Sequence, residues 1–195
     1  MVNYWVFTGP GKQYLHNKYQ VNIFRVHDIT DKTVEILKKG LTLVGEPEEL
    51  RRNYCYEFKH LPGNLFKVLE DGRYLRGAYY VITDHRGDYV GSAGWNHYDD
   101  NTALVMTRMY VIPKFRRSYI MGHAVLPSIL DEVADYNNVW MTVNHYNKGL
   151  YYWFVRVSQG RERGLCDWPD IYKKFKPIGE RDVYNTKQLV MEYQK

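Results

Sequence analysis

The stretch that most constrains this fold runs from Met109 to Leu126, with the sequence MYVIPKFRRSYIMGHAVL. Its apolar run ends at Pro113, which has no N–H group for a neighbouring strand, so a strand must end there. Three cations follow, and apolar residues then recur at spacings of three and four, which predicts an amphipathic helix over 118–136. A strand that leads through a basic turn into a helix indicates an anion site, because a helix N-terminus presents unpaired N–H groups and a partial positive charge.

The segments on either side of this stretch predict a mixed sheet. Turn residues at spacings of about ten residues separate strands at 76–83, 89–95 and 102–112, which is typical of an antiparallel meander. The strand expected at 138–143 follows the helix directly, so it should lie parallel to the third strand in a right-handed βαβ crossover over 102–143. The fold class is therefore α/β (α+β), with a mostly antiparallel central sheet and flanking helices.

The remaining elements are shorter and less regular. Thr8–Tyr14 is a Gly- and Pro-containing cluster that we expect to interrupt any regular element. Alternation and capping signals predict a strand at 19–29, helices at 31–41, 46–61 and 147–159, and a final strand at 187–193. There is no repeat and no linker, so a single domain is expected.

Composition suits a folded protein with an anionic ligand. The net charge is +5, from 27 Lys and Arg against 22 Asp and Glu, which is below the excess of a dedicated nucleic-acid binder. Tyrosine is abundant, at 19 of 195 residues, and favours a tyrosine-rich core and rim over a stacking surface for bases. Nucleic-acid binding remains a third alternative, and a steep loss of affinity with salt would be its signature.

Several function classes find no support in the sequence. Cys55 and Cys166 stand far apart, and the seven histidines show no ligand spacing, so neither a disulfide framework nor a metal site is expected. We read both cysteines as reduced thiols of a cytoplasmic protein. The N-terminus lacks a signal-peptide pattern, and no apolar run is long enough to cross a bilayer, so no membrane partner is expected.

The order of the predicted elements resembles the GNAT family of acyl-CoA N-acyltransferases over residues 20–193. The matching segments are YVIPKFRRSYIMGHAVL for the strand, turn and acyl-CoA helix, VWMTVNHYNKGLYYWF for the next strand and Asn-led helix, and YKKFKPIGERDVYNTKQLVMEY for the closing hairpin. The resemblance implies one GNAT-like domain over 1–195. Within it, 1–75 would shape the acceptor side, 76–159 would form the acyl-CoA core, and 160–195 would form a loop and strand pair.

The pyrophosphate loop of this family usually reads Arg or Gln, two residues, Gly, one residue, then Gly or Ala. Counted from Arg116, the small positions fall on Tyr119 and Met121, and counted from Arg117 they fall on Ile120 and Gly122. Glycine matters there because the backbone approaches the phosphates closely, so the loop departs from the family pattern. The resemblance implies a coenzyme A site made of Tyr110, Val111, Ile112, Arg116, Arg117, Ser118, Tyr119, Ile120, Met121, Gly122, His123 and Asn147.

Catalysis in the family usually needs a base near the third strand and a tyrosine on a later helix as general acid. The third strand has no carboxylate, so Asp99, with Asp100 beside it, is the candidate base at the start of the strand, on the condition that this end faces the cleft. Seven residues after Asn147, the family's tyrosine position holds Phe154. Tyr151 and Tyr152 are the nearby candidates for the acid, and packing at the rim of the core is the alternative for both.

The resemblance implies an acyl-CoA-dependent N-acyltransferase that transfers an acetyl group by direct attack of an amine. Its co-substrate would be acetyl-CoA, without a metal, and its acceptor a small molecule or a protein. The alternative is a catalytically inactive GNAT-fold protein that acts as a binding or structural component, because the loop, the base and the acid all depart from the family pattern. The composition suits a viral or otherwise divergent member, and the resemblance also suggests a homodimer through the C-terminal strands or a protein partner.

Overall fold

The computed structural model describes residues 12–16, 19–26, 77–116, 120–160 and 170–195. The helices expected at 31–41 and 46–61, and both cysteines, lie outside the described residues. The chain divides into two compact units. Unit 1 comprises residues 1–96 and 108–120, and unit 2 comprises residues 97–107 and 121–195.

The described strands are hydrogen-bonded in the order β1-β2-β3-β4-β5-β6-β8-β7. β5 and β6 pair in parallel, whereas β1–β2, β2–β3, β3–β4, β6–β8 and β7–β8 pair antiparallel. The predicted mixed, mostly antiparallel sheet is therefore confirmed. The strands are β1 Lys12–His16, β2 Tyr19–Val26, β3 Gly77–Asp84, β4 Tyr89–Asp99, β5 Thr102–Val111, β6 Asn138–Val143, β7 Phe175–Val183 and β8 Thr186–Tyr193.

The helical segments are short apart from α5. They are the 3-10 turns η1 Pro113–Phe115, η3 His145–Asn147 and η4 Asp170–Lys174, the π-helix η2 Met121–Val125, and the α-helices α4 Leu126–Glu132 and α5 Lys148–Ser158. β5 ends at Val111, directly before the Ile112–Pro113 step, as the proline predicted.

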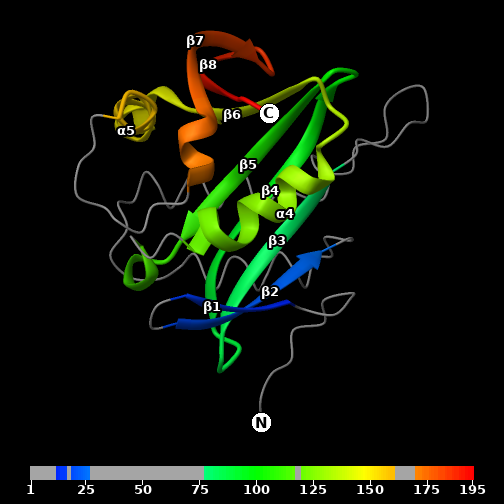
Figure 1. Cartoon of the computed structure of the whole chain (residues 1–195), viewed down its shortest axis with the longest axis vertical. Helices are drawn as coiled ribbons and strands as arrows, with labels where there is room; N and C mark the ends of the chain where they lie inside the picture. The colour runs from blue at the N-terminus through cyan, green and yellow to red at the C-terminus, as the bar shows by residue number, and fades with distance from the viewer. Residues whose placement is uncertain (1–11, 17–18, 27–76, 117–119, 161–169) are drawn as a thin grey trace. The chain divides into compact units, whose positions relative to one another are not determined.

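Unit 1 contains two antiparallel hairpins, β1–β2 and β3–β4 (Figure 1), and local chemistry accounts for the second. Between β3 and β4, the Asp84 carboxylate accepts from the N–H groups of Arg86 (2.8 Å) and Asp88 (3.0 Å), and Gly87 takes the left-handed conformation that the turn needs. The expected break at Thr8–Tyr14 was wrong for Lys12–Tyr14, which form part of β1. The reason is that β1 pairs with β2, and this ladder overrides the local turn signals.

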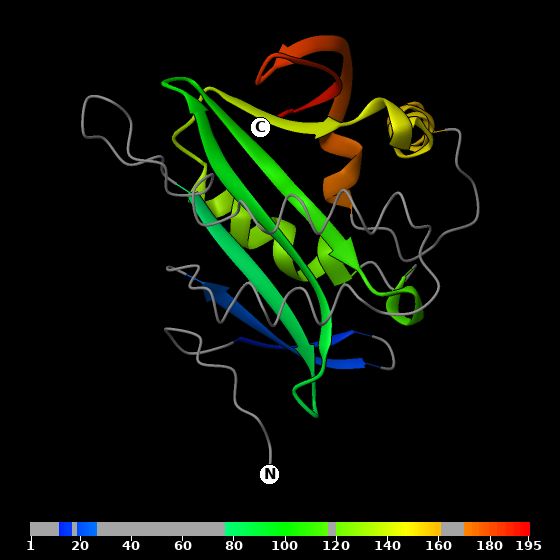
Figure 2. The same cartoon turned by 180° about the vertical axis from the view of Figure 1, so that it is seen from behind.

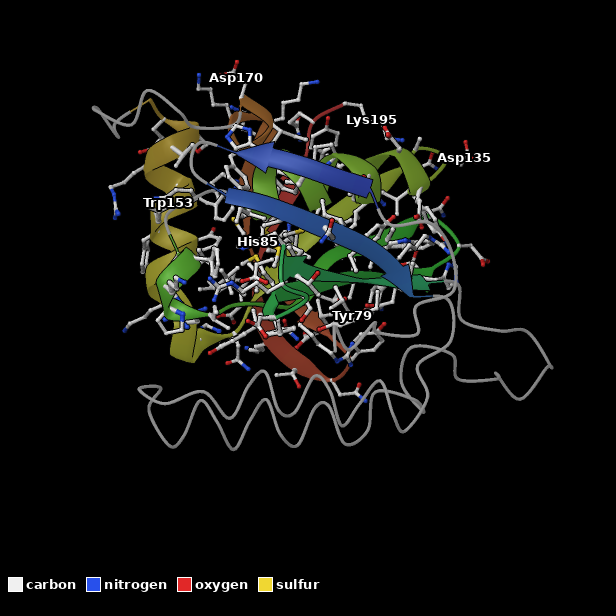
Figure 3. The ribbon with its side chains drawn as sticks, turned by 90° about the horizontal axis from the view of Figure 1, so that it is seen from below. Tyr79, His85, Asp135, Trp153, Asp170 and Lys195 are labelled. Carbon is white, nitrogen blue, oxygen red and sulfur yellow. The ribbon has the colours of Figure 1, made fainter. Side chains whose placement is uncertain are left out.

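A buried hydroxyl network lies inside unit 1. Tyr79, labelled in Figure 3, is fully buried, and its hydroxyl lies 2.9 Å from Ser92 Oγ and 3.2 Å from the Arg108 carbonyl oxygen. The Tyr89 hydroxyl lies 2.6 Å from the same Ser92 Oγ. Gly94 makes room for the Tyr79 ring, because a Cβ at that position would lie 2.6 Å from Cδ2 of the ring.

The core of unit 2 lies on both faces of its strands. Leu104, Val183 and Val190 form one cluster, against which Tyr98, Trp140 and Ile178 pack. α5 packs against η4, β7 and β8. Figures 1 and 2 show α5 beside η4, the orange helical turn that leads into β7.

The helix predicted over 118–136 was only partly right. Residues 117–119 lie outside the described residues, Met121–Val125 form a π-helix, and the α-helix that follows ends at Glu132. Pro127 accounts for the change, because it has no N–H for the bond to residue 123 that an α-helix would require. Pro127 instead stands in the first turn of α4, where a missing N–H leaves no bond unmade.

Tyr79→Phe should lower the free energy of unfolding by about 1–3 kcal/mol, because it leaves the buried Ser92 hydroxyl and Arg108 carbonyl short of a partner. Thermal unfolding should show this as a decrease in Tm of about 2–10 °C. Tyr184→Phe is the matched control, since Tyr184 is 54% exposed, and its effect should stay within about 0.5 kcal/mol. Equal losses in both variants would contradict a stabilising role for the buried network.

Candidate functional site

The end of β5 and the basic turn form a tightly bonded corner in unit 1. The Ile112 N–H donates to the Val90 carbonyl oxygen (3.0 Å), so it faces β4. The Phe115 N–H donates to Ile112 O (3.0 Å), which closes the turn after Pro113. Because consecutive residues of a strand direct their backbone groups to opposite sides, the backbone groups of Val111 face away from β4.

Arg116 folds back onto this corner. Its Nε donates to the Val111 carbonyl oxygen (2.9 Å), and its guanidinium carbon lies 5.6 Å from the centre of the Tyr110 ring. Tyr110 is buried, whereas Arg116 is exposed. Arg116 therefore has a structural role in the turn in addition to any role toward a ligand, and the Val111 carbonyl is already engaged.

The bulky residues of the loop pattern divide into two groups. Arg117, Ser118 and Tyr119 lie outside the described residues. Ile120 and Met121 are 1% and 4% exposed, so their side chains are core residues. At these two positions the side chains that replace the expected glycines point into the protein.

Gly122 has a packing reason for its size. A Cβ on Gly122 would lie 2.4 Å from both Cζ and the hydroxyl oxygen of Tyr172, in η4. The Tyr172 ring is 7% exposed and stands edge-on to the rings of Phe154 (5.5 Å between centroids) and Trp153 (5.8 Å). No pattern in the sequence predicts this contact, which connects the π-helix to a turn fifty residues further along the chain. His123, in the same π-helix, is partly exposed.

α5 carries the remaining helix candidates, and Figure 3 shows Trp153 on this helix and Asp170 on η4. Asn147 is the exposed N-cap residue of α5, and its side chain makes no capping hydrogen bond to this helix. Tyr151 is 8% exposed and Tyr152 is 53% exposed, with their ring centres 5.8 Å apart. Phe154 is 3% exposed and fully engaged in the aromatic cluster.

A contact between His145 and Glu180 connects the turn before α5 to β7. His145 Nε2 lies 3.0 Å from Glu180 Oε2 on β7, and Lys187 Nζ lies 3.7 Å from Glu180 Oε1. In η4, the hydrogen bond from Lys173, followed by its positive charge, lowers the pKa of the exposed Asp170 carboxyl below its usual value. The contacts of Glu180 and the contact between Lys173 and Asp170 all lie on the surface, so each contributes little to stability.

Asp99 lies away from the α5 candidates within unit 2. Its carboxylate accepts from the Asn101 N–H (2.8 Å) and so closes the turn between β4 and β5. Asn101 O in turn accepts from the N–H of Asn138, the first residue of β6, whereas α5 follows the last residue, Val143. A strand of this length spans about 17–20 Å, so unit 2 does not bring Asp99 together with Tyr151 and Tyr152.

The point where β5 and β6 part is the most distinctive backbone feature. Their parallel pairing runs from Thr102↔Asn138 to Val105↔Met141 and then stops, although β5 continues to Val111. Directly after the last pair, Met106 and Arg108 take left-handed conformations, with φ of 56° and 51°. Such a conformation costs about 1–2 kcal/mol for a residue with a side chain. Strain of this kind concentrates at functional sites.

Thr107 lies between the two left-handed residues and was not identified from the sequence. Its hydroxyl oxygen is buried and has no hydrogen-bond partner within the described part of the chain. A buried group left in this state costs about 1–3 kcal/mol. Threonine is a common residue in strands of β-branched and apolar residues, so the sequence pattern does not indicate that the backbone around Thr107 is strained.

The described residues give no support for a metal site or a membrane span. No group of three His, Cys, Asp or Glu side chains in the described ranges stands close enough to hold a metal ion. Across the same ranges, none of the helices has the length and hydropathy needed to traverse a bilayer.

No protein-family model and no curated protein matches the sequence. Solved structures do match. An acetyltransferase from Streptococcus agalactiae gives a TM-score of 0.55 at 12% identity, covering 89% of this chain and 98% of that chain. A GNAT-family acetyltransferase from Staphylococcus aureus gives 0.53 at 12% identity, covering 89% and 99%, and a protein from Bacillus halodurans gives 0.53 at 13% identity, covering 95% and 90%.

These similarities identify the architecture. The chain has the fold of the GNAT acetyltransferases, as the order of its sequence elements predicted. At such low identity the likeness concerns the fold alone, and function depends on the residues of the site.

Gly122→Ala should lower the free energy of unfolding by about 1–3 kcal/mol, because the new methyl group must displace the packed Tyr172 ring. Gly149→Ala is the matched control. A Cβ on Gly149, near the start of α5, would meet nothing within 4 Å, so this change should raise stability by about 0.5–1 kcal/mol. Denaturant unfolding of both variants measures the difference, and a neutral Gly122→Ala would contradict the tight contact with Tyr172.

Proposed function

We propose that this chain is an acyl-CoA-dependent N-acyltransferase, which transfers the acetyl group of acetyl-CoA to an amine. The observation that carries the proposal is the end of the β5–β6 pairing at Val105 and Met141, while β5 continues. Backbone groups beyond that point can pair with an extended ligand that has its own amides, as the pantetheine arm of coenzyme A has.

The anionic end of the ligand would lie at the basic turn. Arg116 and Arg117 would supply charge, and the N–H groups over 117–123 would supply hydrogen-bond donors. The buried side chains of Ile120 and Met121 leave those two positions unobstructed by their own side chains. Asn147 and His123, both in unit 2, are further candidate contacts to coenzyme A.

The chemistry is direct transfer. The amine nitrogen attacks the thioester carbonyl carbon, a C–N bond forms, and the carbonyl electrons move to oxygen. The C–S bond then breaks, the nitrogen loses a proton, and the thiolate gains one. Tyr151 and Tyr152 are the candidate acids, and Tyr152 is the more exposed of the two. Asp99 is occupied in a turn, so we assign removal of the amine's proton to water rather than to this carboxylate.

The setting of the reaction belongs to the same proposal. The acceptor would be an amine of a small molecule or of a protein, and the reaction would take place in the cytoplasm. β7 stands at one end of the strand order, so a homodimer through the C-terminal strands is compatible with the sheet.

A second candidate is a GNAT-fold protein without transferase activity that acts as a binding or structural component. Two observations favour it: the aromatic cluster holds Phe154 where the family has tyrosine, and Tyr172 fills the space beside Gly122. Thermal unfolding with acetyl-CoA distinguishes the two candidates.

Acetyl-CoA at 100 times its Kd should stabilise the protein by about 2.7 kcal/mol. For a chain of this size, the increase in Tm should be about 5–10 °C. The absence of a shift at millimolar acetyl-CoA would contradict the transferase proposal and favour the binding component, whose partners would then be sought among proteins.

The double variant Arg116→Ala/Arg117→Ala should weaken acetyl-CoA binding by about 1.5–3 kcal/mol for each charged hydrogen bond that is lost. Titration calorimetry measures the affinity. The control Lys176→Ala/Lys187→Ala removes the same charge from exposed positions on β7 and β8 and should leave affinity unchanged. Equal affinities in the two double variants would place the phosphates away from the basic turn.

A further inference from the structure

We propose that the hydroxyl group of Thr107 donates a hydrogen bond to the carbonyl oxygen of the bound acyl thioester. This inference rests on the proposed transferase function and adds a specific residue to it. Three observations meet at Thr107: its position relative to the β5–β6 pairing, the strained backbone around it, and the state of its hydroxyl.

The position follows from the register. The last parallel pair is Val105↔Met141, so Thr107 would stand opposite Val143 if the ladder continued. The ladder does not continue, and the chain beyond Val143 passes through the turn that leads to Asn147 and α5. Thr107 therefore stands just past the last shared hydrogen bonds of two strands, where an extended ligand can take the place of a strand.

The backbone gives Thr107 an orientation that a regular strand would not. Met106 before it and Arg108 after it both have left-handed φ values, although neither is glycine. Two such residues around a single position disrupt the alternation of side chains and re-aim the one between them. A conformation this unfavourable persists only where the surrounding structure imposes it, and it is typical of sites that hold a ligand in a fixed geometry.

The third observation is that the hydroxyl group of Thr107 has no hydrogen-bond partner within the described part of the chain. Thr107 Oγ1 is buried, and no hydrogen bond to it is found across the described ranges. A buried donor without a partner destabilises the ligand-free protein, so its presence calls for a partner that arrives later. A thioester carbonyl oxygen can only accept a hydrogen bond, and a hydroxyl can donate one.

The interaction would strengthen during the reaction. When the amine nitrogen bonds to the carbonyl carbon, the electron pair of the C=O bond moves onto the oxygen, which becomes an oxyanion. Thr107 keeps its proton throughout and only donates the hydrogen bond. The electron pair returns when the C–S bond breaks and the thiolate leaves. A donor in this position stabilises the transition state more than the bound substrate.

Thr107→Val tests the proposal, because it replaces the hydroxyl by a methyl group of similar shape. The Tm of the ligand-free variant should be equal to or higher than that of the wild type, since an unpartnered polar group has been removed. Thr107→Ser keeps the hydroxyl and is the matched control for the loss of the donor.

The ligand-bound readout uses [1-¹³C]acetyl-CoA as the probe. A hydrogen bond to the carbonyl oxygen moves its ¹³C resonance downfield, and we expect this shift in the wild type and in Thr107→Ser but not in Thr107→Val. Binding of coenzyme A without the acetyl group should be the same in all three proteins. With a nucleophilic amine as acceptor, kcat should fall by about 10²–10³-fold in Thr107→Val, with little change in KM for acetyl-CoA.

The outcomes separate the two proposals. If the wild type does not bind acetyl-CoA, the transferase function fails and the role of Thr107 fails with it. If the wild type binds and Thr107→Val shows the same ¹³C shift, the function stands and the role of Thr107 is overturned. A clear loss of Tm in ligand-free Thr107→Val would also overturn it, because the hydroxyl would then have a structural partner such as a buried water.

Discussion

The short parallel ladder between β5 and β6 is the constraint on which the rest of the structure depends. A parallel ladder needs a crossover, and the segment from Met121 to Glu132 supplies it within unit 2. Because the ladder ends after Val105↔Met141, β5 must continue without β6 beside it. Strand edges without partners are unfavourable in a folded protein unless another chain, a loop or a ligand covers them. The end of this ladder is therefore the backbone feature on which the proposed ligand site rests.

The strained backbone after the ladder needs support, and a buried tyrosine provides part of it. The hydroxyl of Tyr79 approaches the carbonyl oxygen of Arg108, the second of the two left-handed residues, and Gly94 leaves the space for its ring. Hydrogen bonds in a buried setting are costly to break, so this network fixes the carbonyl against relaxation of the strain. The tyrosine-rich composition therefore has a concrete use in the core, as a source of rigid rings that carry a polar group to a buried backbone atom.

The sequence predicted the elements that are marked by a regular spacing of residues or by a residue, such as proline, that ends a strand. Turn residues at regular spacing marked the meander, Pro113 ended β5, and the strand after the helix was correctly paired in parallel. The π-helix was not predicted, because the missing N–H of Pro127 makes an irregular turn only when packing holds the residues before it in a helix. The strand β1 was missed because its pairing with β2 outweighs the turn residues beside it. For the site, the basic turn was visible as charge, whereas strain and burial at Thr107 depend on the register of two strands and leave no trace in composition.

The loop after β5 shows that a small residue in a motif matters through the space that it leaves beside the backbone. In the family pattern a small residue admits a phosphate, but here the space beside Gly122 is occupied by the phenol of Tyr172. Conversely, Ile120 and Met121 break the pattern in the sequence while their buried side chains take no room on the outer side of the backbone. A backbone N–H can bind an anion whatever side chain it carries, provided that the side chain points elsewhere. Departure from the motif therefore does not by itself argue against an acyl-CoA ligand. The stronger argument against it is the filled space beside Gly122, and a ligand at this loop would have to bind along the neighbouring backbone instead.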